Sequence, residues 1–215
     1  MRYCGAIFDL DGVITDTAKY HYLAWKRLAD ELGLYFDEKI NERLKGIGRL
    51  ESLEIILQEN GKYFSRREKE YYANKKNEYY VEMIRRITPQ DLLPGVADLI
   101  SNLKDLGVKL AVASASKNAP AVLKNLGLVE WFDYIVDAGQ IKKGKPDPEI
   151  FLVAAWNIGV KPRECVGFED SVVGIAALKA AGMFAVGVGD EKRLKDADLV
   201  VKDLTPTEQI LKLFL

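Results

Sequence analysis

Two aspartates follow the apolar run Ala6 to Phe8 near the start of the chain, in the sequence AIFDLDG. Asp9 and Asp11 stand two residues apart, and because strand side chains alternate, they tend to point to the same side. Like charges placed in this way repel, so a metal ion, a shared proton or solvent must offset them. By itself the pair fits the capping of a turn equally well, and D-x-D also holds the metal of sugar-nucleotide transferases.

A second acidic pair ends a later apolar run, in the sequence ECVGFEDS. Glu169 and Asp170 are followed by Ser171, so capping of the next helix is the simpler role for these residues. If both runs are strands of one sheet, however, four carboxylates meet at one edge and repel unless a cation lies among them. Hard oxygen ligands suit Mg²⁺, and we favour a magnesium site over independent helix caps.

Polar residues in two other predicted loops suit a phosphate group. Ser114 opens the sequence SASKN between a predicted strand and a helix, where a hydroxyl and backbone N–H groups can bind an anion. Lys145 adds a point charge, although taken alone it is most simply a surface lysine. The run Gly139 to Lys145 matches G-x-x-x-x-G-K, but Pro146 stands where a nucleotide-binding P-loop needs Ser or Thr, which excludes that kind of site.

Alternating strand and helix patterns position these residues. After the first run, strand patterns recur at residues 108–114, 134–138, 164–168, 184–188 and 198–201, with helical patterns between them. This order predicts a doubly wound, Rossmann-like α/β fold with a parallel sheet covered on both faces. Such sheets bind ligands at the carboxyl ends of their strands, where the acidic pairs and Ser114 are expected. A terminal helix is predicted to begin with a cap formed by Thr205, Pro206 and Glu208.

Residues 17–87 carry only helical patterns, so we expect an all-helical insert after the first strand. Gly33 and Gly61 end two of its predicted helices, and Ser65 with Glu68 predicts a capping box for a third. The remaining residues, 1–16 and 88–215, are then the α/β core. Because the insert leaves from the carboxyl end of the first strand, we expect it to lie over the same edge and close over a substrate.

The composition fits a globular protein of one domain with an insert. The 215 residues are 48% hydrophobic and 29% charged, and the net charge of −1 argues against a nucleic-acid binder. No apolar run reaches the roughly 18 residues of a membrane span. Asp9 and Asp11 interrupt the early apolar stretch, which argues against a signal peptide. Two cysteines do not make a disulfide framework, so we expect a cytoplasmic protein.

Four motifs in this order resemble the haloacid dehalogenase superfamily, and the resemblance covers the whole chain. It implies that the helical insert is the small cap of that superfamily. It also implies that Asp9 is the nucleophile that takes a phosphoryl group and that Asp11 is the general acid/base. The motifs further imply that Mg²⁺ is bound by Asp9, the backbone carbonyl of Asp11, Glu169 and Asp170, and that the phosphoryl group is bound by Ser114 and Lys145.

The sequences LKGIGR, KKN and SASKN resemble those of the sugar-phosphate mutases within the superfamily. The resemblance implies an enzyme that interconverts β-D-glucose 1-phosphate and β-D-glucose 6-phosphate through the 1,6-bisphosphate, which is the activating intermediate. We expect the enzyme to be a monomer. Thr17 and His21 resemble hinge residues that help to seat Asp11. The implied substrate- or phosphate-binding residues, besides Ser114 and Lys145, are Lys45, Gly46, Arg49, Lys76, Ala115, Ser116, Lys117 and Asn118.

Simpler explanations stand beside these roles. Arg49 could be an exposed first-turn residue, His21 a polar position on an amphipathic helix, and Lys76 part of a solvated helix face. The main functional alternative is a Mg²⁺-dependent sugar-phosphate phosphatase of the same superfamily, in which water takes the phosphoryl group. A catalytically inert binding protein on this scaffold is disfavoured, because binding alone has no need of Asp11.

Overall fold

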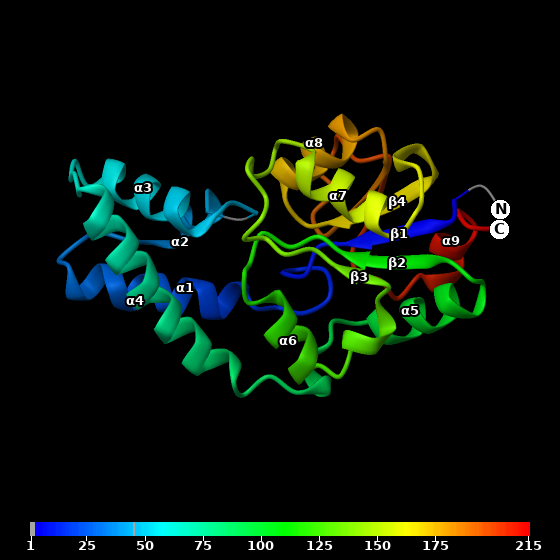
Figure 1. The fold of residues 1–215 in the computed structure, drawn as a ribbon, viewed down its shortest axis with the longest axis horizontal. Helices are drawn as coiled ribbons and strands as arrows, with labels where there is room; N and C mark the ends of the chain where they lie inside the picture. Colours follow the sequence, from blue (N-terminus) through cyan, green and yellow to red (C-terminus); the bar gives the residue numbers. More distant parts are fainter. Residues whose placement is uncertain (1–2, 45) are drawn as a thin grey trace. The chain divides into compact units, whose positions relative to one another are not determined.

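The computed structural model describes residues 3–44 and 46–215 of the chain and divides it into two compact units (Figure 1). The larger unit, the core, comprises Met1–Asp16 and Ile87–Leu215, and the smaller unit, the insert, comprises Thr17–Arg86. Ile87 therefore belongs to the core, although its sequence context suggested the insert.

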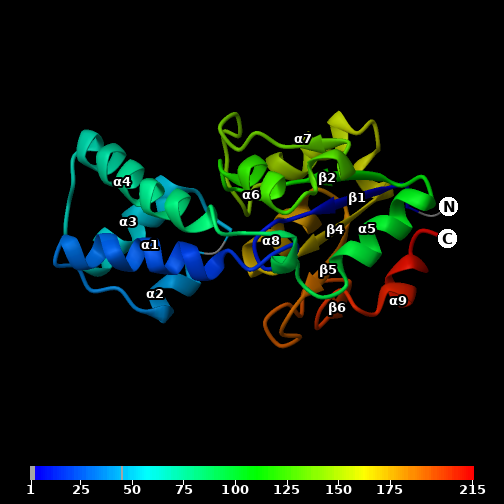
Figure 2. The same ribbon diagram turned by 90° about the horizontal axis from the view of Figure 1, so that it is seen from below.

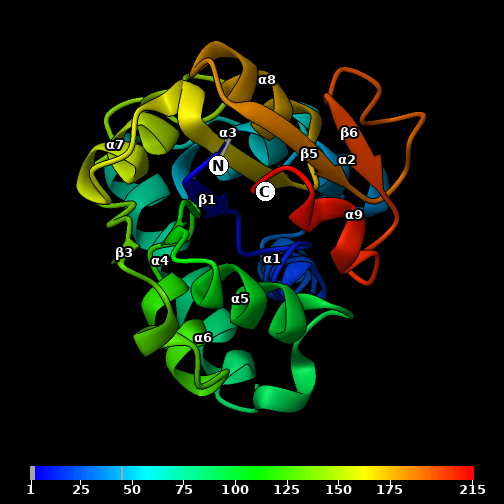
Figure 3. The ribbon, with the colours of Figure 1, turned by 90° about the vertical axis from the view of Figure 1, so that its right-hand side faces the viewer.

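The core is built on a sheet of parallel strands in the order β3-β2-β1-β4-β5-β6. Helices α7 and α8 cover one face of this sheet, and α5, α6 and α9 cover the other (Figure 3). The predicted doubly wound α/β fold is thus confirmed. The strands are β1 (Gly5–Phe8), β2 (Lys109–Val112), β3 (Tyr134–Ile135), β4 (Cys165–Glu169), β5 (Phe184–Val188) and β6 (Leu199–Val201). The helices are α5 (Val96–Asp105), α6 (Ala119–Asn125), α7 (Glu149–Asn157), α8 (Val172–Ala180) and α9 (Thr207–Leu211), with short 3₁₀ turns at Pro89–Asp91, Val129–Trp131 and Pro162–Glu164.

The central strand β1 is apolar on both sides because both faces of the sheet are covered. Its Ile7 packs in one cluster with Phe151 of α7 and Leu178 of α8. Phe8 stacks on Phe168 of β4, with the ring centroids 4.5 Å apart. A Cβ atom on Gly167 of β4 would lie 2.0 Å from a methyl carbon of Leu178, so this glycine lets α8 approach the sheet closely.

Two hydrogen bonds join the core segments on either side of the insert. The Thr15 hydroxyl donates to the carbonyl oxygen of Asp91 at 2.7 Å, and the Leu93 amide donates to the carbonyl oxygen of Ile14 at 2.9 Å. A β-bridge between Thr15 and Leu92 lies between them. The chain therefore leaves the core and returns to it through a paired base that belongs to the core itself.

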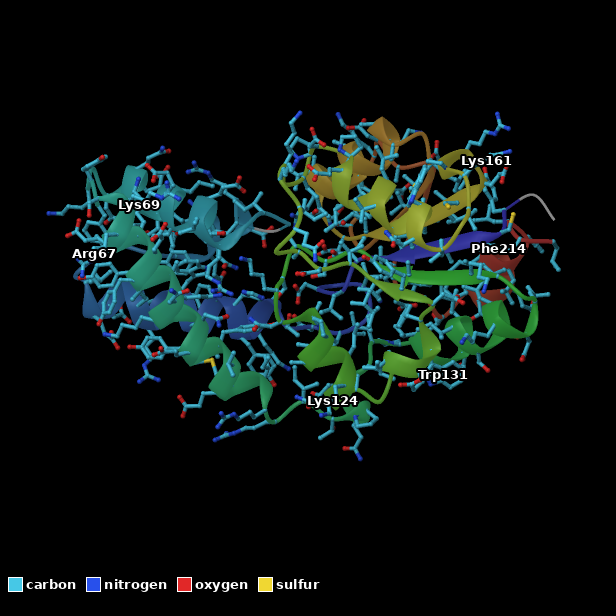
Figure 4. All side chains as sticks on the ribbon, viewed as in Figure 1. Arg67, Lys69, Lys124, Trp131, Lys161 and Phe214 are labelled. Atoms are coloured by element: carbon cyan, nitrogen blue, oxygen red, sulfur yellow. The ribbon has the colours of Figure 1, made fainter. Side chains whose placement is uncertain are left out.

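The C-terminal helix begins differently from the prediction. Pro206 is the N-cap residue of α9 and Thr205 does not cap it, because the Thr205 hydroxyl donates to the carboxylate of Asp203 instead. The predicted cap is therefore wrong in its residue, although the helix is present. Beyond α9, Phe214 (labelled in Figure 4) is buried and packs edge-on against Tyr3, with the centroids 6.5 Å apart.

The insert consists of α1 (Ala18–Glu31), α2 (Glu38–Glu42), α3 (Arg49–Glu59) and α4 (Arg66–Ile84). Helices α1 and α4 lie side by side (Figure 2), and a cluster that includes Trp25, Leu28 and Leu53 forms the insert's own core. The predicted capping box of Ser65 and Glu68 is confirmed at the start of α4. The short helix α2 has no counterpart in the sequence analysis, because so few residues carry little periodicity.

Within residues 3–44 and 46–215, every helix is too short or too polar to span a bilayer.

Candidate active site

Strand β1 delivers Asp9 to the carboxyl edge of the sheet. Phe8 pairs with Phe168 in the parallel register, and this places Asp9 beside Glu169, the last residue of β4. The Asp9 amide donates to the carbonyl oxygen of Phe168 at 2.9 Å, which continues the ladder by one residue. Both carboxylates are buried, so their charges need partners within the protein.

Lys145 supplies positive charge to both carboxylates. Its Nζ donates to Asp9 Oδ1 at 2.7 Å and to Glu169 Oε2 at 2.6 Å. The side chain is buried, and Nζ lies 4.9 Å from the ring centroid of Phe151. The interpretation of Lys145 as an ordinary surface lysine is therefore wrong.

Burial and charge act in opposite directions on these groups. Burial is the main cause that raises the pKa of Asp9 to about 6; Lys145 opposes this rise and the charge of Glu169 adds to it. Burial alone would lower the pKa of Lys145, but the charges of Asp9 and Glu169 outweigh it and raise that pKa above its ordinary value. The Lys145 ammonium group therefore lies in hydrogen-bond contact with both carboxyl groups.

Ser171 fixes the orientation of Glu169. Glu169 Oε1 accepts hydrogen bonds from the Ser171 amide at 3.0 Å and from the Ser171 hydroxyl at 2.7 Å. The same hydroxyl accepts from the amide of Gly174 at 3.1 Å and so forms the N-cap of α8. Helix capping and placement of the carboxylate are thus one arrangement here, not the alternatives that the sequence suggested.

Three carboxylates can share a cation at this edge. Oxygen atoms of Asp9, Glu169 and Asp170, one from each residue, all lie within 4.8 Å of one another. The set consists of oxygen donors alone and therefore fits a hard ion such as Mg²⁺.

The carboxylate of Asp11 does not belong to this group, although the sequence analysis expected four carboxylates to converge. Strand β1 ends at Phe8, and Asp11 lies in a turn where it forms a bridge with Thr15. The alternation of a strand therefore does not extend to Asp11. Gly12 follows with a φ of +78°, and a Cβ atom there would lie 2.3 Å from Asp170 Oδ2, so both backbone and space require glycine.

The loop after β2 brings Ser114 to the same edge. The Ala113 amide donates to the carbonyl oxygen of Phe8 at 2.8 Å, so buried Ser114 follows the end of β2 just as Asp9 follows the end of the neighbouring β1. The Ser114 hydroxyl accepts from the amide of Ser116 at 3.1 Å and thereby shapes the loop. Of the other predicted residues in the loop, Lys117 is exposed, and Ala115, Ser116 and Asn118 are half-buried.

In the insert, Arg49 is the first residue of α3 and is half-buried, which lowers the pKa of its guanidinium. Gly48 is the N-cap residue of that helix, and Gly46 lies in the preceding turn with a φ of +75°. Lys45, also predicted to bind substrate, lies outside the described residues.

Lys76 is not part of a solvated helix face. Only 2% of it is exposed, and its Nζ lies 2.7 Å from His21 Nδ1. Burial lowers the pKa of His21 well below its ordinary value, and the charges of Lys76 and Arg49 act in the same direction. Thr17, the N-cap residue of α1, is buried.

Sequence reasoning missed two aromatic residues that surround this pair. Trp25 and Tyr80 are both buried and lie within about 5 Å of the Lys76 ammonium, measured to their ring centroids. Each stands four residues after a predicted site residue, Trp25 after His21 and Tyr80 after Lys76. That i, i+4 spacing, which places side chains on one face of a helix, was the available signal.

Comparison with known proteins gives matches along almost the whole chain. A family model for haloacid dehalogenase-like hydrolases matches residues 5–182. Beta-phosphoglucomutase of Bacillus subtilis (strain 168) is 50% identical over 204 residues, which cover 93% of this chain and 90% of that protein. A phosphorylated carbohydrates phosphatase of Thermotoga maritima is 32% identical over 220 residues, 95% of each chain. The crystal structure of beta-phosphoglucomutase from Clostridium difficile matches with a TM-score of 0.96 and 49% identity, covering 99% of this chain and 97% of that one.

Proposed function

The chain belongs to the haloacid dehalogenase-like hydrolase family, and we propose that it is a phosphomutase that interconverts β-D-glucose 1-phosphate and β-D-glucose 6-phosphate. The observation that carries this proposal is the 50% identity to a beta-phosphoglucomutase across 93% of the chain. The carboxylates and the lysine at the strand ends supply the groups that phosphoryl transfer needs, namely a nucleophile, a cation and buried positive charge.

Asp9 is the proposed nucleophile. In the phosphorylated enzyme its Oδ carries the phosphoryl group, and the 6-hydroxyl of β-D-glucose 1-phosphate attacks the phosphorus. The bond from phosphorus to Asp9 breaks as the bond to the sugar oxygen forms, which gives the 1,6-bisphosphate. After the bisphosphate has turned round, Asp9 attacks the 1-phosphate and regains the phosphoryl group, and β-D-glucose 6-phosphate leaves.

Asp11 is the proposed acid/base. It takes the proton of the attacking 6-hydroxyl in the first half-reaction and returns a proton to the leaving 1-oxygen in the second, so the protons balance over one turnover. Its carboxylate stands apart from the metal-binding group of Asp9, Glu169 and Asp170. This separation suits a group that exchanges protons while its neighbour stays ionised.

Asp9, Glu169 and Asp170, with the backbone carbonyl of Asp11, are the proposed ligands of Mg²⁺. Bound there, Mg²⁺ supplies positive charge that offsets the charge of the carboxylates and of the phosphoryl group. Lys145 and the hydroxyl of Ser114 are proposed to bind the phosphoryl oxygens. Ser171 keeps Glu169 in the orientation that this role requires.

A bisphosphate intermediate also needs a group for the phosphate that is not being transferred. We assign this role to Arg49, whose guanidinium can bind phosphate oxygens in pairs, and to the polar loop Ser116, Lys117 and Asn118. Thr17 and His21 are proposed hinge residues, and Lys76, Gly46, Lys45 and Ala115 are proposed to contribute to substrate binding. Glucose 1,6-bisphosphate is the proposed activator, because it phosphorylates Asp9 at the start of turnover.

The test supplies β-D-glucose 1-phosphate, a trace of the 1,6-bisphosphate and Mg²⁺, and compares glucose 6-phosphate with free phosphate over time. A mutase produces glucose 6-phosphate in large excess. Free phosphate as the main product contradicts the proposal and favours a phosphatase. Removal of Mg²⁺ with a chelator is expected to stop either reaction.

A matched pair of variants tests the second phosphate site. Arg49→Ala is expected to reduce mutase turnover by about 10²-fold, because charge-assisted hydrogen bonds to the bisphosphate are lost. Hydrolysis of a simple phosphate monoester, which has no second phosphate, should fall far less. Arg43→Ala is the control, because Arg43 is exposed and pairs with Glu59 on the insert surface. Equal losses of both activities in Arg49→Ala would argue against a second phosphate site.

A sugar-phosphate phosphatase is the second candidate function. The 32% identity to a phosphorylated carbohydrates phosphatase over 95% of the chain favours it. The two functions differ only in the acceptor of the phosphoryl group from Asp9, which is a sugar hydroxyl in the mutase and water in the phosphatase.

The proposal includes a small sugar phosphate as the partner, a monomeric state and a cytoplasmic location. Sedimentation of the purified chain tests the monomer, and fractionation of cells that produce it tests the location.

A further inference from the structure

Lys76 lies in a box of aromatic rings within the insert. Its Nζ is 4.9 Å from the ring centroid of Trp25 and 5.0 Å from that of Tyr80. His21 completes the box, with its ring centroid 4.0 Å from that of Tyr80 and its Nδ1 2.7 Å from Lys76 Nζ. The four residues come in two pairs with i, i+4 spacing, one on α1 and one on α4, which are packed side by side. We call this group the lysine box.

The rings of the lysine box favour a charged lysine. An ammonium ion loses its hydration when it is buried, and this loss favours the neutral amine. The negative faces of aromatic rings attract a cation but not a neutral amine, and this attraction is stronger when the cation is desolvated. Trp25 and Tyr80 are buried, so water does not weaken this attraction.

A charged Lys76 determines which nitrogen of His21 carries the proton. An ammonium group has donors only, so His21 Nδ1 at 2.7 Å must accept with its lone pair. The ring is then neutral with its proton on Nε2. Burial and the charges of Lys76 and Arg49, which lower the pKa of His21, agree with a neutral ring.

We propose that Trp25 and Tyr80 are positioning residues of the enzyme, whose ring faces keep Lys76 charged and thereby fix His21 as the neutral tautomer protonated on Nε2. The consequence for turnover rests on the proposed mutase function. Lys76 and His21 then present their donors in one arrangement before the sugar phosphate binds. Such preorganisation lowers the ordering cost of binding and keeps the donors aligned during transfer.

The tautomer can be observed directly because His21 is the only histidine in the chain. Protein labelled with ¹⁵N-histidine gives the two ring-nitrogen signals of this one residue in a long-range proton–nitrogen correlation spectrum. At neutral pH the 215-residue chain is expected to show a neutral ring with the proton on Nε2. A charged ring, a proton on Nδ1 or an even mixture of tautomers would overturn the proposal without any variant.

Three variants test the contribution of the rings. Trp25→Leu and Tyr80→Leu remove one ring face each, and we expect the His21 spectrum to change toward a mixture of tautomers or a charged ring. Tyr80→Phe keeps the ring face and should retain the spectrum of the unchanged protein. Tyr71→Leu is the matched control, since Tyr71 also lies on α4 but is 62% exposed. If either leucine variant is folded and keeps the original spectrum, the rings do not set the tautomer.

Kinetics separates positioning from loss of fold. For the leucine variants we expect kcat/KM with β-D-glucose 1-phosphate to fall at least about tenfold, and Tyr80→Phe to restore it to within about threefold. Phosphorylation of Asp9 by acetyl phosphate, which carries no sugar, should fall much less. If both leucine variants fail to fold, the spectrum of the unchanged protein still decides on the tautomer, and a Tyr80→Phe variant that loses more than about threefold in kcat/KM contradicts the role of the ring face. If the unchanged chain shows no mutase activity, the proposed function fails while the spectra decide on the lysine box.

Discussion

The core and the insert each bury a lysine, and they hold its charge in different ways. In the core, Lys145 lies between the carboxylates of Asp9 and Glu169 at 2.7 and 2.6 Å. In the insert, Lys76 faces the rings of Trp25 and Tyr80 and the imidazole of His21. The first arrangement matches a cation with full negative charges, and the second places a cation against aromatic rings that carry no net charge.

The difference shows what each region can do. Carboxylates that pair with an ammonium ion can also bind another cation, so the core arrangement suits a site whose charge balance changes during a reaction. Rings have no net charge to exchange, so the lysine box keeps one charge state and one geometry. The core therefore suits chemistry on a phosphoryl group, and the insert suits recognition by fixed donors.

The largest expected difference in turnover comes from replacing the residue that accepts a hydrogen bond from each lysine, Asp9 in the core and His21 in the insert. Asp9→Asn should reduce turnover by at least about 10⁴-fold, because the proposed nucleophile is lost. His21→Gln removes a proposed hinge residue and should reduce it by only about 10- to 100-fold. Both are measured as the rate of glucose 6-phosphate formation, and Asp9→Asn should also lose hydrolysis of simple phosphate esters. Substantial turnover in Asp9→Asn would rule out Asp9 as the nucleophile.

Replacing the lysines tests the two ways of holding charge. With metal chelated, Lys145→Met leaves two buried carboxylates without their cation, and we expect a loss of about 3–5 kcal/mol in the free energy of unfolding. Lys76→Met should change it by no more than about 1 kcal/mol, because the lost cation–π attraction is offset by relief from burying an ammonium ion. Denaturant unfolding of both variants measures the contrast. Equal losses would mean that the rings and the carboxylates hold a cation equally strongly.

A substitution at Gly12 tests the carboxylate site of the core, because the absence of a side chain at Gly12 leaves room for the Asp170 carboxylate. Gly12→Ala should weaken Mg²⁺ binding by about 10- to 100-fold, since a Cβ atom 2.3 Å from Asp170 Oδ2 displaces this proposed ligand. Gly107→Ala is the control, with a similar φ of +74° and nothing within 4 Å of the added Cβ atom. Backbone strain alone should lower stability by about 1–2 kcal/mol in the control without a change in Mg²⁺ affinity. Calorimetric Mg²⁺ titration decides, and equal affinities of the two variants would contradict the assignment of Asp170.

The smallest expected effect is the pH dependence of the lysine box. His21 has a lowered pKa in the folded chain, so below its ordinary value near 6.5 the unfolded chain binds a proton that the folded chain does not. Its contribution therefore makes stability fall as pH falls through about 6.5. Between about pH 7.5 and 5.5 the unchanged chain should lose about 1 kcal/mol more than His21→Gln. Denaturant unfolding at the two pH values measures this difference, and equal losses would show that the folded chain binds the proton too.

Much of the core follows from the sequence because its signals are local. Strand β1 is a continuous apolar run, as expected of a strand buried on both faces, and the acidic residues that follow β1 and end β4 stand at the edge that a parallel order predicts. The position of the Asp11 carboxylate did not follow, because it depends on the turn at Gly12 and the bridge to Thr15.

The insert is harder to predict, because burial there comes from another helix. Lys76 has polar and charged sequence neighbours, and it is buried because α4 packs against other helices of the insert, α1 among them. The same limit applies to Thr205, whose hydroxyl could reach either a helix terminus or Asp203. When a short polar side chain has two possible partners nearby, the sequence pattern alone does not predict which of them it binds.

The paired base formed by Thr15 with Asp91 and by Ile14 with Leu93 bears on how such a chain could arise. Since hydrogen bonds within the core hold the two ends of the insert together, the length of the insert has little effect on the free energy of folding. Each doubling adds only about 0.6 kcal/mol of closure entropy. Evolution could therefore lengthen, shorten or exchange the segment between these ends while the catalytic edge of the sheet stayed intact. Substrate choice could then diversify independently of the chemistry.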